Sequence, residues 1–145
     1  MVEVHLYIEV DSTAVRVSNK WFGYVLECSV HGEPRTREGF GKIEGTYHKT
    51  VLTAMVHGIK RINQSCEVHV HTDNTYILRM IEKNLERWAV RDFMTTKGKP
   101  VANEEEWREL WSLSQKQLIL TEPGKHIYSG WLQAEIEKRK EQESG

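Results

Sequence analysis

Two segments of the chain end in an aspartate that is followed by small polar residues. Val4 to Asp11 continues as Ser-Thr, and Cys66 to Asp73 continues as Asn-Thr-Tyr. An aspartate at the end of a buried strand can hold a divalent cation at the carboxyl edge of an α/β sheet, the usual place for ligands in such sheets. The same residue type also caps helices, because its oxygens accept hydrogen bonds from free N–H groups. The local sequence leaves metal binding and capping open.

The elements that must position these aspartates follow from changes in the hydrophobic period. Phe22, Tyr24 and Leu26 alternate with their neighbours as in a strand, whereas Val51, Met55 and others recur at helical spacing. We expect strands over 2–10, 21–30, 35–43, 67–72 and 118–120, helices over 47–63, 75–88 and 129–142, and a further helix capped by Asn103.

This order of elements, taken with Cys66–Tyr76 and with the Trp-bearing basic segment Met80–Trp111, resembles cellular type 1 ribonuclease H. The resemblance covers roughly residues 2–122 in the family's order. It implies an α/β fold of the ribonuclease H type, with a mixed five-stranded sheet flanked by helices. The sheet would join a three-strand antiparallel meander to parallel strands, in a single domain over residues 1–145.

Composition limits the partners of the chain. Of 145 residues, 39% are hydrophobic, and no apolar run approaches the roughly 20 residues that span a bilayer. No secretion signal is evident, and Cys28 and Cys66 are more typical of core residues in a reducing compartment than of a disulfide, so we expect a cytoplasmic protein. The net charge of −1 gives no general attraction to nucleic acid. Binding to nucleic acid must therefore be local.

The resemblance also implies a mechanism. In the family, two divalent ions of the Mg²⁺ type lie about 4 Å apart and clamp the scissile phosphate. Their ligands are an aspartate on the first strand, a glutamate on the first helix, an aspartate on the fourth strand and an aspartate on the last helix. Carried over by position, the first is Asp11 and the third is Asp73. We expect these two metal ligands to lie on neighbouring strands with converging carboxyl groups.

At the other two ligand positions the chain does not carry the residues that the family has there. The position of the helix glutamate falls on Thr50, and Glu44 is the nearest acidic side chain that could replace it. On the last helix, Glu135 or Glu137 stands near the position of the aspartate. We therefore expect weak binding of Mg²⁺ or Mn²⁺, with at most one ion held well.

Three histidines have a structural and a functional interpretation each. His126 is either the counterpart of the family's proton-shuttling histidine or a plain loop residue. His69 and His71 share a strand face with Asp73, where they could orient a ligand or hold a metal. Hydrogen-bonded structural histidines are the alternative, because Mg²⁺ prefers oxygen ligands.

The basic segment predicts the surface for an RNA/DNA hybrid. Its aromatic residues could instead pack a small local core, but packing does not explain the lysines of its loop. The residues that match the family's protrusion are Trp88, Phe93, Lys97, Lys99 and Asn103. Three hypotheses follow: a hybrid-binding protein that cleaves RNA weakly or not at all, an active ribonuclease with a rearranged site completed by Glu135, Glu137 or Glu44, and a protein-interaction domain on the same scaffold.

Overall fold

The computed structural model describes residues 1–144 and contains one five-stranded sheet in the order β3-β2-β1-β4-β5. β1 pairs antiparallel with β2 and parallel with β4, β2 pairs antiparallel with β3, and β4 pairs parallel with β5. This arrangement is the expected mixed sheet, with a meander joined to parallel strands. The strands are β1 (Val2–Val10), β2 (Ser18–Val30), β3 (Glu33–Gly45), β4 (Cys66–Thr72) and β5 (Leu118–Pro123).

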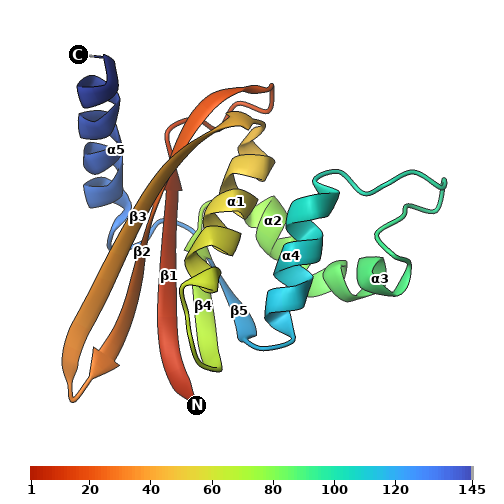
Figure 1. The fold of residues 1–145 in the computed structure, drawn as a ribbon, viewed down its shortest axis with the longest axis horizontal. Helices are drawn as coiled ribbons and strands as arrows, with labels where there is room; N and C mark the ends of the chain where they lie inside the picture. The colour runs from red at the N-terminus through yellow and green to blue at the C-terminus, as the bar shows by residue number, and fades with distance from the viewer. Residues whose placement is uncertain (145) are drawn as a thin grey trace.

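Helices cover the two faces of the sheet unequally (Figure 1). Most of them lie on one side, and the last helix alone lies on the other. The first group is α1 (Tyr47–Lys60), α2 (Thr75–Lys83), α3 (Leu85–Val90) and α4 (Glu104–Ser114), and the last helix is α5 (Ser129–Ser144). No helix within residues 1–144 combines the length and apolar character that a bilayer crossing requires.

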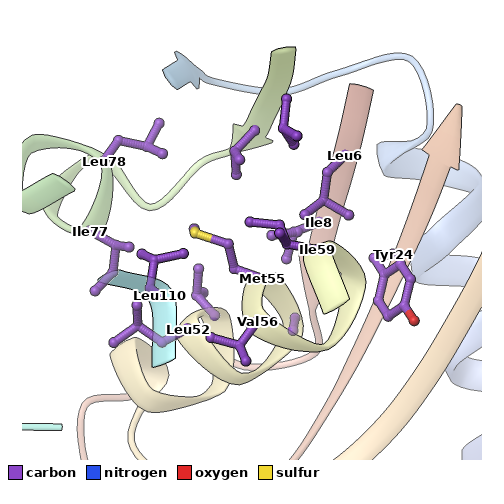
Figure 2. Packing of buried hydrophobic residues seen from close by; sticks show 14 of the residues in the cluster. Leu6, Ile8, Tyr24, Leu52, Met55, Val56, Ile59, Ile77, Leu78 and Leu110 are labelled. Carbon is purple, nitrogen blue, oxygen red and sulfur yellow. The ribbon is translucent and has the colours of Figure 1, made fainter. Parts of the chain in front are cut away.

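The main core lies between the sheet and α1. Leu6 and Ile8 of β1 meet Leu52, Met55 and Ile59 of α1, and all five are nearly or completely inaccessible to solvent (Figure 2). Burial of each such side chain contributes about 1.5–3 kcal/mol. Alternate residues of β1 point to the opposite face, so the core fixes which side chains face α5.

Element bounds differ from those expected by at most three residues, and one predicted helix is divided. The single helix predicted over 75–88 is divided at Asn84 into α2 and α3. Asn103 precedes α4 in the left-handed conformation, with φ 61°, and makes no side-chain capping bond. Its backbone carbonyl accepts from Trp107 N instead, at 3.1 Å. Asn103 is therefore the N-cap of α4, as predicted, and it caps the helix through its backbone carbonyl.

A buried lysine holds the segment after β1 against the start of α1. Lys20 has no accessible surface, and its ammonium donates to Arg16 O, Ser18 Oγ and Gly45 O at 2.7, 2.7 and 2.8 Å. Gly45 ends β3 just before Thr46, whose side chain caps α1 by accepting from Lys49 N. These bonds satisfy a charge that would otherwise be costly to bury.

Candidate active site

A small hollow lies at the carboxyl edge of β1 and β4, where the family would place its chemistry. Its volume is about 90 Å³. The parallel register ends with the pair Tyr7 and His71, and Glu9 and Asp73 each lie two residues further along the chain. Both carboxylates line the hollow. Other residues that line the hollow are Tyr47 and Val51 from α1, Lys125 from the loop after β5 and Gln133 from α5.

Asp73 does not cap the helix that follows it. The cap of α2 is Asn74, whose Oδ1 accepts from Ile77 N at 2.9 Å. The Asp73 carboxylate instead lies 3.0 Å from the Lys125 ammonium, and this contact raises the pKa of Lys125. The capping interpretation is therefore wrong for Asp73, whose side chain faces the hollow.

Glu9 is held by neighbours on the α5 side. Its carboxylate accepts from Gln133 Nε2 at 2.8 Å and from Ser129 Oγ at 2.9 Å, and His126 Nε2 is 3.3 Å away. Burial raises the pKa of Glu9, but the hydrogen bonds from His126, Gln133 and Ser129 outweigh that effect, and the pKa lies below its ordinary value. Glu9 is thus a buried, ionised and hydrogen-bonded carboxylate.

Asp11 occupies a different surface from Asp73. It follows the end of β1, accepts from Trp21 N at 2.9 Å and lies 3.2 Å from Lys140 Nζ. It lines a second hollow with Trp21 and Lys42, and Glu9 takes the place beside Asp73 that was expected for Asp11. The two acids are only two residues apart in the sequence, so residue type alone does not tell which of them lies beside Asp73.

The predicted ligand position on α1 is also wrong, by one residue. Thr50 is fully buried, and its hydroxyl donates to Thr46 O at 2.7 Å, so it does not line the hollow. Tyr47 and Val51, four residues apart, form the helix face that does. An apolar Val51 therefore stands where a carboxylate from α1 could reach Asp73.

The remaining acidic candidates lie away from the hollow. Glu135 contacts Lys138 and Arg139, Glu137 contacts Lys140, and Glu44 is exposed on the edge strand β3. Gln133 is the α5 side chain that lines the hollow. Sequence reasoning missed it because an amide in a charged helix gives no chemical signal of its own.

None of the three candidate histidines lines the hollow of Asp73. His126 is almost wholly buried; its Nδ1 accepts from Tyr128 N at 3.2 Å, so Nε2 carries the proton and lies 3.0 Å from Ile8 O. His69 and His71 do share a strand face, but they contact Glu122 and His5 and do not line the hollow of Asp73. Burial and the neighbouring His5 lower the pKa of His71 to about 4.

The donor set does not fit a pair of divalent cations. Within residues 1–144 the hollow offers the carboxylates of Glu9 and Asp73, one of which is bound by Lys125 and the other by three hydrogen-bond partners. Two adjacent dications repel each other strongly and need several carboxylates to offset that repulsion. An ammonium beside Asp73 opposes them further.

The segment between α3 and α4 extends away from the sheet (Figure 1). Phe93 is buried, and Trp88 packs edge-on against Trp107 with ring centroids 5.1 Å apart. Lys97 and Lys99 flank Gly98 and are exposed. The aromatic residues therefore form the local core, and the lysines are free to meet a ligand.

The family profile described as RNase H matches residues 10–127. The chain belongs to the ribonuclease H family. A ribonuclease H of Nitrosospira multiformis is 36% identical over 99 residues, which cover 68% of this chain and 61% of that protein. The alignments span less than two thirds of the length of the first curated relatives. The family is generally dependent on divalent metal ions.

Solved structures show the same fold. LC9-RNase H1, a type 1 ribonuclease H with the type 2 active-site motif, has a TM-score of 0.72 at 15% identity, covering 92% of this chain and 69% of that one. A foamy viral protease-reverse transcriptase in complex with an RNA/DNA hybrid has a TM-score of 0.63 at 16% identity, covering 84% of this chain and 17% of that one.

Proposed function

We propose that this ribonuclease H-family chain binds RNA/DNA hybrids and cleaves the RNA strand weakly or not at all. The observation that carries the proposal is the hollow at Asp73, in which Val51 and Gln133 line the α1 and α5 walls and Lys125 neutralises Asp73. With such a donor set, Mg²⁺ or Mn²⁺ binds weakly, and one ion at most is held. The metal-dependent step of a ribonuclease H is then disabled, while the fold remains.

Hybrid binding is supported by the exposed lysines and by the relatives. Lys97 and Lys99 stand on a protruding loop whose packing does not need them. Such lysines suit phosphate oxygens, which position a nucleic acid without reading its sequence. The curated relatives are ribonucleases H, and a protein of the same fold has been solved with an RNA/DNA hybrid.

The test joins binding to cleavage in one preparation. The unaltered chain should bind a labelled RNA/DNA hybrid at low salt and release little product in Mg²⁺ or Mn²⁺. Changing Lys97 and Lys99 together to Ala should weaken binding and flatten its salt dependence by roughly one to two in log–log slope. Lys116 and Lys138, both exposed, provide the control pair of the same charge.

Two outcomes would contradict the proposal. Rapid Mg²⁺-dependent cleavage abolished by Asp73→Asn would show an active enzyme with a rearranged site. Absence of hybrid binding at low salt would leave the protein-interaction hypothesis in its place.

A further inference from the structure

The sheet face opposite α1 carries a repeated tripeptide on two adjacent strands. Glu-Val-His occurs at residues 3–5 in β1 and again at residues 67–69 in β4. The parallel register aligns the two copies residue by residue, pairing Glu3 with Glu67 and His5 with His69. Because the valines point into the core, the four polar side chains meet on the other face. The register therefore builds a cluster of two imidazoles and two carboxylates.

The distances between the donor atoms of this cluster are close to those between ligands of a single metal ion. Glu3 Oε1 lies 2.9 Å from His5 Nε2 and 3.5 Å from His69 Nε2. His69 Nε2 is also 3.1 Å from Glu67 Oε2. Donors around a tetrahedral ion with bonds of about 2.0–2.1 Å are about 3.3 Å apart. Glu3, His5 and His69 each offer a ligand atom, all within 4.8 Å of one another.

The Nδ1 atoms of His5 and His69 already have hydrogen-bond partners. His69 Nδ1 lies 3.0 Å from Glu122 Oε1, and His5 Nδ1 lies 2.8 Å from His71 Nε2. A metal-binding histidine almost always donates its second N–H to a carboxylate or another acceptor, which fixes the ring and its tautomer. In both rings the partnered Nδ1 leaves Nε2 turned towards Glu3. Each ring is thus oriented as a metal ligand would be.

We propose that Glu3, His5 and His69 form a binding site for a Zn²⁺-type transition-metal ion, with Glu67 beside His69 at its edge. Two imidazole nitrogens favour Zn²⁺, Ni²⁺ or Cu²⁺ over Mg²⁺, which prefers an all-oxygen set. The carboxylates offset the ion's charge. The site joins β1 to β4 and shares none of these residues with the hollow of Asp73.

The position in the fold leaves the cluster accessible. Helix α5 begins near Glu9, to which Ser129 is bonded, and in Figure 1 it runs away from the end of β1 that carries the N-terminus. The side chains of Glu3, His5 and His69 are 55%, 30% and 14% exposed. An ion can therefore enter from solvent.

Titration calorimetry of the chelator-treated full chain with ZnCl₂ tests the proposal. We expect one Zn²⁺ per chain, unaffected by millimolar Mg²⁺, and a tetrahedral absorption band when Co²⁺ is used as the probe. His69→Ala and Glu3→Gln should each weaken binding at least tenfold, and Glu122→Gln should weaken it by about 10-fold through the orientation of His69.

Matched controls separate this site from other histidines and from the hollow. His31 lies exposed in the β2–β3 turn with φ 53°, a conformation that Asn tolerates, so His31→Asn should bind Zn²⁺ normally. Asp73→Asn should also bind normally. Circular dichroism confirms that each variant is folded, and half-exposed Glu3 supplies a second test should His69→Ala fail to fold. Absence of stoichiometric binding, equal binding by both Glu3→Gln and His69→Ala, or loss of binding in Asp73→Asn would overturn the proposal.

Discussion

The ammonium of Lys125 lies 3.0 Å from Oδ2 of Asp73, and both residues line the hollow. A lysine there competes directly with a divalent cation for the same oxygen. We expect Lys125→Met to raise Mn²⁺ affinity several-fold, because it removes one positive charge next to the ion. Mn²⁺ binding followed by electron paramagnetic resonance measures the change. Lys138→Met, on exposed α5 surface, should leave the affinity unchanged.

The hollow predicts which substitutions would restore a ribonuclease H site. Val51→Glu combined with Gln133→Asp supplies one carboxylate from α1 and one from α5, next to Glu9 and Asp73. We expect this double variant to bind Mn²⁺ more tightly and to gain measurable cleavage of the RNA strand. Because Val51 is buried, the new carboxylates should lower stability, and Mn²⁺ should recover part of that loss.

Thr50→Glu is the matched control for this restoration. It adds the same charge one residue earlier on α1, at a fully buried position that does not line the hollow. It should destabilise the chain without raising Mn²⁺ affinity. Equal metal binding by Thr50→Glu and Val51→Glu would contradict the placement of the α1 wall.

The fold was largely predictable because the signals that set it are local. Alternation in β1 and β4, helical spacing in α1 and the turn at His31 each appear within a few residues of sequence. The mixed five-stranded sheet follows from their order, and the chain's membership of the family confirms it.

The site was less predictable because pairing between distant strands decides it. Glu9 lies in β1 and Asp11 just after it, and only the packing of β1 beside β4 makes Glu9 the acid that shares a hollow with Asp73. On α1, a displacement of one residue turns a side chain by about 100°, which separates buried Thr50 from Val51. Neither choice can be read from the residue types.

His48 links the start of α1 to the cap of α2 and should give a pH-dependent stability. Its Nδ1 lies 2.9 Å from Asn74 Nδ2 and accepts that amide proton only while the ring is neutral. Burial lowers the pKa of His48 below 6.5. The unfolded chain therefore binds this proton more readily, and stability that is fully present above pH 6.5 is lost as the pH falls from there through the lower pKa of the folded chain.

The measurement is urea unfolding between pH 7.5 and 5. The unaltered chain should lose more stability over this interval than His48→Gln, which keeps an uncharged acceptor. His31→Asn removes an exposed histidine and should follow the unaltered chain. A pH profile of His48→Gln identical to that of the unaltered chain would argue against a role for His48.

Lys20 should contribute to the stability of the fold although it lies outside the hollow. Its ammonium donates to Arg16 O, Ser18 Oγ and Gly45 O and so joins the segment after β1 to the residue before the α1 cap. Lys20→Met keeps the length of the side chain but leaves the buried Gly45 carbonyl and the partly buried Arg16 carbonyl without this donor. Relief of the buried charge offsets part of the loss, so we expect destabilisation of about 1–3 kcal/mol in urea unfolding.

Lys116→Met, at an exposed position, should stay within about 0.5 kcal/mol of the unaltered chain. A Lys20→Met chain as stable as the unaltered one would show that water or a rearranged loop satisfies these carbonyls.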